Sequence, residues 1–135
     1  MNQRVVKRML PVALAVLEDP GICMVTEGTL LRVYRGVISS MGAAMVMSSF
    51  KAAVVFYADG GDSNRDLPRA EVLRAVHAVA TATFTDDGFR YQLKQPEEIT
   101  AEILPVDEKI LSSLKESYIN AAIALKQAMN VFSLV

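Results

Sequence analysis

The chain has few of the residues that carry metal, redox or hydrolytic chemistry. Its 135 residues include one cysteine, Cys23, one histidine, His77, and no tryptophan. A lone cysteine cannot form an intramolecular disulfide, which indicates a reducing, cytoplasmic compartment. A zinc site draws mainly on Cys and His ligands. With no second histidine and no partner for Cys23, we expect no metal and no cofactor.

A long apolar run is also missing. The longest stretch without a charged residue covers residues 36–50, and its fifteen residues include four serines. A membrane-spanning helix needs about 20 predominantly apolar residues. We therefore expect no contact with a membrane.

The common motifs of catalysis are absent as well. The sequence has no Gly-x-Ser-x-Gly elbow, and Gly60-Gly61 lacks the Lys-Ser/Thr that completes a phosphate loop. Adjacent carboxylates occur in three pairs, which we interpret as solvated surface because neighbouring helix residues do not face one another: Asp86-Asp87, Glu97-Glu98 and Asp107-Glu108. The sequence thus predicts a protein that is not an enzyme, and a small enzyme that uses His77 with a carboxylate stays open as an alternative.

What the chain does have is the composition of one folded helical domain. Hydrophobic residues make up 52% of it and charged residues 21%, which excludes disorder as the main state. Its length is that of a single domain. Because helical periodicity dominates, the sequence predicts an all-α fold, a single-domain bundle of five or six helices over residues 1–135.

Apolar residues at helical spacing predict four helices before residue 84: residues 2–18, 29–48 and 49–58, and a fourth after the turn-rich loop 59–68. Asn2 is placed to cap the first helix and Asp66 the fourth. On the fourth helix, His77 lies beside an apolar face that runs from Val72 to Thr83. We interpret His77 as a partly buried structural residue.

The C-terminal third has one ambiguous segment and one clear helix. Residues 84–104 fit either a two-stranded ribbon or a short helix. Pro105 is expected to open the last helix, in which Ile119 and Ile123 lie beside the main apolar stripe. A helix with such wide apolar coverage is either central or partly covered by another subunit. The stripe residues that we expect to be largely buried are Leu111, Leu114, Tyr118, Leu125 and Phe132.

Positive charge gathers in the first part of the chain. Residues 1–58 hold six basic and three acidic side chains, whereas residues 59–135 hold eight basic and twelve acidic ones. Arg32 and Arg35 share a helix face with the small residue Gly36. Such a face permits close approach of a nucleic acid or protein backbone, but an ordinary polar face with a tight helix contact explains it too.

Residues 33–44, with the sequence Val-Tyr-Arg-Gly-Val-Ile-Ser-Ser-Met-Gly-Ala-Ala, resemble a motif of a known family. That family is the small α-helical subunit of the type III-B CRISPR effector, the Cmr complex. Its Tyr-Lys/Arg-Gly-x-Ile-Ser-Ser-Phe-Gly-Ala run precedes a basic residue and an Ala-rich helix that ends in aromatics. Residues 50–57 fit that continuation, and residues 124–128 match the closing Ala-Leu-Lys pattern.

The resemblance covers about residues 4–83 and 118–134. It departs at Met41, where the family has an aromatic residue, and at Ser49-Phe50, where the family has Gly-Leu. Residues 84–104 have no counterpart in the motif. The departures at Met41 and at Ser49-Phe50 concern packing more than surface chemistry.

The resemblance implies a non-catalytic subunit that stacks along the path of the guide RNA and target RNA. It also implies contacts with further copies of the chain, with the backbone subunits and with the large polymerase/cyclase-like subunit. RNA cleavage in such complexes is assigned to other subunits. The residues that we expect to contact RNA phosphates, the last two to a lesser extent, are Arg32, Arg35, Lys51, Lys7 and Arg8. A generic helical protein–protein adaptor without an RNA role is the alternative.

Overall fold

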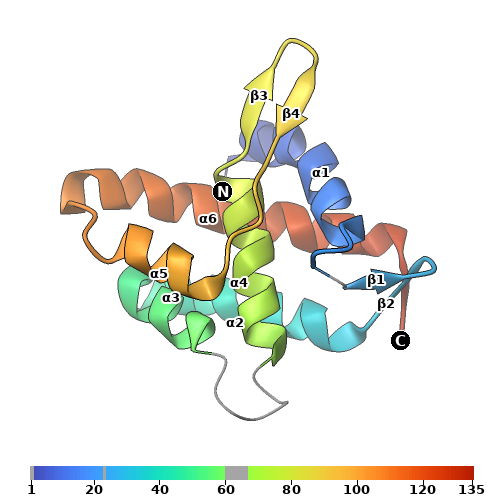
Figure 1. The fold of residues 1–135 in the computed structure, drawn as a ribbon, viewed down its shortest axis with the longest axis horizontal. Helices are drawn as coiled ribbons and strands as arrows, with labels where there is room; N and C mark the ends of the chain where they lie inside the picture. Colours follow the sequence, from blue (N-terminus) through green and yellow to red (C-terminus); the bar gives the residue numbers. More distant parts are fainter. Residues whose placement is uncertain (1, 23, 60–66) are drawn as a thin grey trace.

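The computed structural model describes residues 2–22, 24–59 and 67–135. This part of the chain forms six helices and confirms the all-α bundle (Figure 1). The helices are α1 (Gln3–Glu18), α2 (Arg32–Met47), α3 (Phe50–Ala58), α4 (Leu67–Ala80), α5 (Pro96–Ile103) and α6 (Glu108–Ala128). The short strands are β1 (Val25–Thr26), β2 (Thr29–Leu30), β3 (Thr83–Thr85), β4 (Gly88–Arg90) and β5 (Ser133–Leu134).

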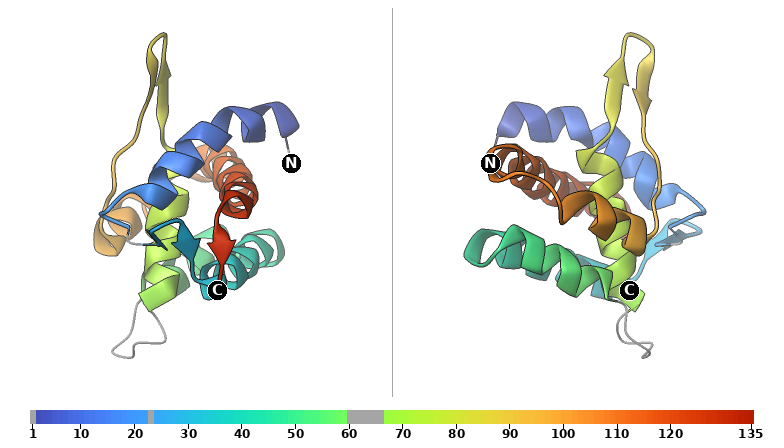
Figure 2. Two further views of the ribbon diagram at one scale, coloured as in Figure 1. Left: turned by 90° about the vertical axis from the view of Figure 1, so that its right-hand side faces the viewer. Right: turned by 60° about the vertical axis from the view of Figure 1, so that its left-hand side comes forward.

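The helices α4 and α6 form the centre of the bundle. The long α6 packs against α1, α2 and α4, and two turned views show it between α1 and α2 (Figure 2). From Val72 to Val79 every side chain of α4 except that of Arg74 is buried. A helix that is buried on nearly all sides has no clear polar face. The hydrophobic periodicity of α4 therefore identified only some of its buried residues.

The apolar stripe of α6 is buried only along its middle and C-terminal turns. Tyr118 and Leu125 are fully buried, as expected. Leu111, Leu114 and Phe132 pack against the core but are partly exposed, so they are less deeply buried than the other two. The first turns of α6 extend beyond the crossing with α4 (Figure 1), and Phe132 follows the short 3-10 turn that ends the helix.

Helix starts follow local capping chemistry. The side chain of Asn2 accepts a hydrogen bond from the Val5 N–H at 3.3 Å, which confirms the predicted cap of α1. The Asp107 side chain accepts one from the Lys109 N–H at 3.4 Å. The last helix therefore begins at Glu108 and not at Pro105. The cap predicted for Asp66 lies outside the described residues.

The second helix begins three residues later than expected. Thr29 and Leu30 form β2, which pairs antiparallel with β1 and parallel with β5. Glu27 and Gly28 both have positive φ, 53° and 77°, and they reverse the chain between β1 and β2. The apolar residues that predicted a helix from residue 29 therefore begin in strand β2 and continue on α2.

Residues 84–104 contain both of the structures that were weighed for them. A hairpin of β3 and β4 pairs Phe84 with Phe89 and projects from the bundle (Figure 1). The short helix α5 follows it. Thr83 belongs to β3 and is exposed, so the apolar face of α4 does not extend to it.

A search of the described residues for a helix with the length and apolar character of a membrane span found none.

Candidate RNA-binding face

The first turn of α2 lies against the C-terminal end of the chain. The backbone N–H of Arg32 donates to the Val135 carbonyl at 2.7 Å. One turn later, the Arg35 guanidinium Nη1 donates to the Asn130 Oδ1 at 2.6 Å. The Arg32 side chain is exposed and that of Arg35 half-exposed. Both predicted arginines thus stand beside the end of α6.

Lys51 lies elsewhere and has structural partners. Its Nζ donates to the carbonyl oxygens of Leu104, at 2.8 Å, and Val106, at 2.9 Å. These carbonyls follow the end of α5, where helix termini leave acceptors unpaired. The stretch of α2 from Arg35 to Met47 alone spans about 18 Å. The structure therefore does not bring Lys51 together with Arg32 and Arg35.

Lys7 and Arg8 are exposed on α1 and point to different neighbours. The Arg8 guanidinium lies 4.0 Å from the ring centre of Phe84, in a cation–π contact with the hairpin. Lys7 lines a shallow hollow with Gln127 of α6. Of the two, Lys7 is the one that approaches the end of α6.

Lys126 is a basic residue that the sequence analysis did not select as a site residue. It stands on α6 next to Gln127 and across from Ser39 of α2. It is also one turn before Asn130, which holds Arg35. We call the surface formed by Arg32, Arg35, Lys126 and Lys7 the basic face. In the sequence, Lys126 is distinguished as the only charged residue after Glu116, which could have marked it as a candidate.

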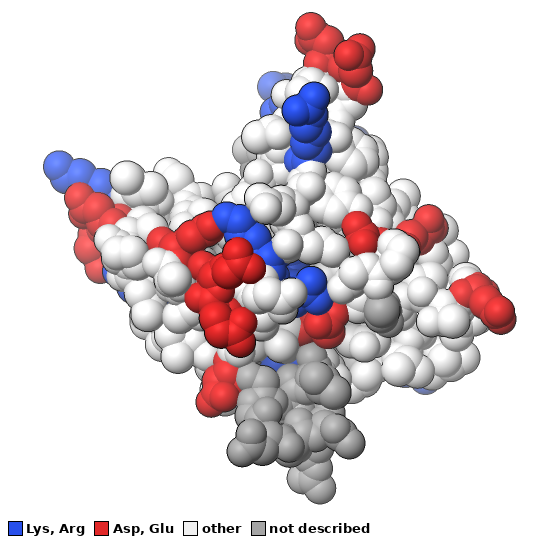
Figure 3. All heavy atoms as spheres, in the orientation of Figure 1, with Lys and Arg blue, Asp and Glu red and all other residues white. Residues whose placement is uncertain are grey.

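The stretches of chain that form the basic face contain no Asp or Glu. Residues 3–17, 32–47 and 117–135 together hold six Lys or Arg and no Asp or Glu. The view in Figure 3 shows Asp and Glu over α5, at the hairpin tip, near the start of α6 and on the right-hand side, where α1 ends and the β1–β2 turn lies. The lack of carboxylates within the stretches of the basic face favours a local positive potential there.

The cations of the basic face are also unneutralised. Within the described ranges, no carboxylate forms an ion pair with Arg32, Arg35, Lys126 or Lys7. The ion pairs that the structure does show involve Arg74, Lys94 and His77, which lie on other elements. Surface ion pairing therefore does not account for the arginines of α2.

Small residues on α2 leave its backbone accessible. Ser39 and Ala43 are exposed, and a Cβ added at Gly36 would meet no atom within 4 Å. Nothing inside the chain thus requires glycine at this position. A phosphate or a backbone from outside can approach α2 closely here.

His77 forms a separate, buried network. Its Nδ1 lies 2.5 Å from the Tyr118 hydroxyl, and its Nε2 lies 3.7 Å from the Glu102 Oε2. Glu102 is paired in turn with Lys94. Burial lowers the pKa of His77, and this effect exceeds the opposing attraction of the Glu102 carboxylate. A neutral imidazole can accept a hydrogen bond from the Tyr118 hydroxyl through Nδ1, and this contact ties α4 to α6.

The carboxylate pairs lie on the surface, as the sequence analysis expected, and most of the methionines named below lie in the core. All six carboxylates of the three pairs are exposed. Met9, Met41 and Met45 are buried, whereas Met47 is 85% exposed. In the described part of the chain, no group of three or more His, Cys, Asp or Glu side chains is placed to hold a metal ion.

Comparison of the chain with models of protein families, with curated proteins and with solved structures found no match.

Proposed function

We propose that the chain is the non-catalytic small subunit of a type III-B CRISPR complex that uses a guide RNA to target RNA. The observation that carries the proposal is the position of the motif at residues 33–44. Its Ser39 lies across from Lys126, its Arg35 bonds Asn130 one turn after Lys126, and residues 32–47 contain no Asp or Glu. The α-helical bundle agrees with the helical subunit that the motif suggests.

In this role the basic face lies along the paired guide and target RNA. Guanidinium and ammonium groups bind phosphates through charge-assisted hydrogen bonds. Such contacts add affinity without reading sequence, which suits a subunit that must accept any guide. Lys51 lies apart from the face, so a phosphate contact by Lys51 would belong to a separate point of the RNA path.

The remaining surfaces are available for the protein partners of such a complex. These partners are the backbone subunits, the large polymerase/cyclase-like subunit and neighbouring copies of the chain. The complex acts in the cytoplasm. Chemistry on RNA is left to other subunits in this proposal, and His77 serves the fold.

The proposal is tested by purification from the cells that encode the chain. The tagged protein should bring down a ribonucleoprotein that contains short guide RNAs of uniform length. The tag alone, expressed in the same cells, is the control. Recovery of the protein without RNA, or with protein partners only, would contradict the RNA role.

A helical adaptor without an RNA role is the second candidate, because an exposed apolar groove lies between α2 and α6. An adaptor would bind its partners without any salt-dependent RNA contact. An enzyme that uses His77 would be supported only by an activity that His77→Ala removes from a folded protein.

A further inference from the structure

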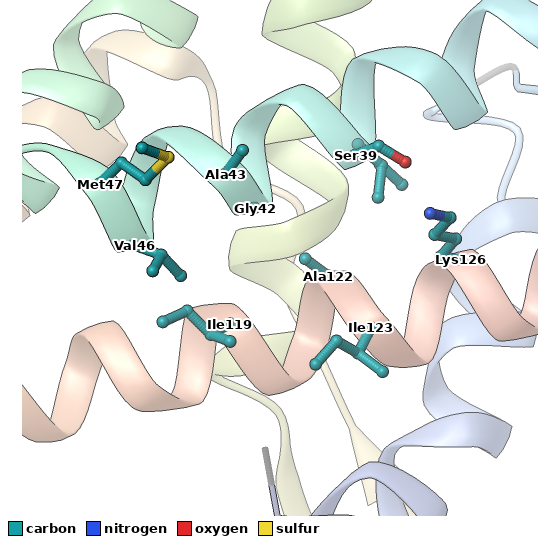
Figure 4. Close-up of a pocket in the computed structure, with 10 residues that line it drawn as sticks. Ser39, Gly42, Ala43, Val46, Met47, Ile119, Ala122, Ile123 and Lys126 are labelled. Atoms are coloured by element: carbon teal, nitrogen blue, oxygen red, sulfur yellow. The ribbon is translucent and has the colours of Figure 1, made fainter.

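A groove with a volume of about 410 Å³ runs between α2 and α6 (Figure 4). Gly42 and Ala43 line it from α2, and Ile119 and Ile123 line it from α6. Figure 4 shows Lys126 at the end near Ser39 and the side chains of Val46 and Met47 at the other end. The groove is thus apolar along its length and charged at one end.

The apolar side chains that line the groove are more exposed to solvent than is favourable for an isolated chain. Val46 is 61% exposed and Met47 is 85% exposed, and both line the same groove as the half-buried Ile119 and Ile123. Single exposed apolar residues are ordinary, but a contiguous hollow patch of them marks an interaction site.

Gly42 gives the groove an open wall. Glycine weakens the interior of a helix relative to alanine, and a Cβ at Gly42 would meet no atom within 4 Å. The packing of this chain therefore does not require glycine there. A helix from outside can come closest where the facing side chain is absent.

The charge at the Ser39 end of the groove is positive. Lys126 stands there, Arg35 lies one turn beyond Ser39, and neither α2 nor residues 117–135 contain an Asp or Glu. Glu116 lies one turn before Ile119, toward the other end of the groove. A partner that carries carboxylates at the Ser39 end is attracted, whereas a basic partner is repelled.

We propose that this groove binds an amphipathic, acidic helix of a protein partner. The stretch of α2 from Ile38 to Met47 spans about 13 Å, or about two and a half helical turns. Apolar anchors at positions i, i+3 or i+4, and i+7 of the partner would fill the groove. Its carboxylates would meet Lys126 and Arg35.

Features of the chain argue against two other occupants. A second copy would have to offer an acidic helix, but α5 buries its own apolar residues Ile99 and Ile103. Proteins bind single-stranded RNA through aromatic stacking and cationic side chains, and no aromatic residue lines the groove. The inference does not rest on the proposed RNA role, because it concerns a protein ligand of the isolated chain.

The test uses two designed peptides of about 16 residues, long enough to form a helix. Both carry leucines at the anchor positions, and one has glutamates where the other has lysines. Each is titrated into the full chain by calorimetry, with NMR shifts to locate the contact. We expect the glutamate peptide to shift Gly42, Ala43 and Ile123, and to bind roughly tenfold more tightly than the lysine peptide.

Variants of the chain separate the groove from the rest of the surface. Gly42→Leu should abolish binding of the glutamate peptide, whereas Gly36→Leu places the same side chain in open space on the same helix and should leave binding unchanged. Lys126→Glu should reverse the preference between the two peptides. Thermal melts of all three variants show that each is folded.

Four results would overturn the inference. They are no binding of either peptide, equal binding of both, an unchanged affinity in Gly42→Leu, or self-association of the wild type that Gly42→Leu removes, since the occupant would then be a second copy. None of these results depends on guide RNA in the purified complex, so this inference and the proposed function can fail separately.

Discussion

Leu125 is fully buried in the last turn of α6. Replacing it with alanine removes buried methyl groups and leaves a cavity. We expect Leu125→Ala to lower the free energy of unfolding by about 2–5 kcal/mol, measured by chemical denaturation. Leu111→Ala, at a half-buried position of the same helix, should cost clearly less. Equal effects of both substitutions would contradict the packing of α6.

His77 makes the stability depend on pH. The folded protein lowers the pKa of His77 below its ordinary value of 6.5, because burial disfavours the imidazolium. The unfolded chain therefore binds the proton more readily, and stability falls as the pH drops below about 6.5. His77 faces Tyr118, Glu102 and Lys94.

The expected result is a loss of stability between about pH 7 and pH 5 that is smaller in His77→Gln than in the wild type. Glutamine does not titrate and still offers an oxygen to the Tyr118 hydroxyl. Denaturation at a series of pH values measures the difference between the two proteins. Parallel pH profiles would show that His77 is not buried as a neutral side chain.

At the scale of the elements, α2 combines a structural and an exposed side. Gly36 lies in the helix interior, and a Cβ there meets no atom within 4 Å. We expect Gly36→Ala to raise the free energy of unfolding by about 0.5–1 kcal/mol, because alanine favours the helix. Gly28→Ala is the matched control: its φ of +77° strains any residue with a Cβ, so this variant should be destabilised. Destabilisation by Gly36→Ala would show that the helix is packed on that side.

The sequence predicted those elements whose determinants are local. Helix α1, with its cap at Asn2, follows from periodicity and capping alone, and so does α3 after Ser49. The strand β2 did not, because each strand has only two residues and, besides its neighbour β1, its partner β5 lies about a hundred residues away. Such pairings are decided by tertiary contacts, to which local patterns are blind.

The candidate site was predictable in composition but not in arrangement. Arg32 and Arg35 could be placed on one face because three residues separate them on a helix. Lys126 could not be placed, because it joins the face only through the packing of α6 on α2. Lys51 could not be placed either, because it is held by the carbonyl of Leu104, 53 residues further along the chain. Only the folded chain brings such residues together.

At the scale of the whole molecule, charge and apolar surface are divided between faces. Carboxylates lie on α5, at the start of α6, at the hairpin tip and around the end of α1 and the β1–β2 turn (Figure 3). The basic face and the apolar groove share α2 and α6, and Lys126 belongs to both. A subunit built in this way can contact RNA and a protein partner side by side.

The most direct test of the account is RNA binding by the assembled complex at increasing salt. The variant Arg32→Ala/Arg35→Ala/Lys126→Ala removes three cations of the basic face. The control Arg90→Ala/Lys109→Ala/Lys115→Ala removes the same charge from other surfaces. Each lost phosphate contact reduces the slope of log affinity against log salt by roughly 0.7 for single strands, so three contacts reduce it by roughly 2.

We therefore predict a weaker affinity and a flatter salt dependence for the first variant, and wild-type behaviour for the control. The subunit must still be incorporated in both complexes, which gel analysis of the purified particles shows. Equal affinities and equal slopes for the two variants would remove the basic face from the RNA path and contradict the account.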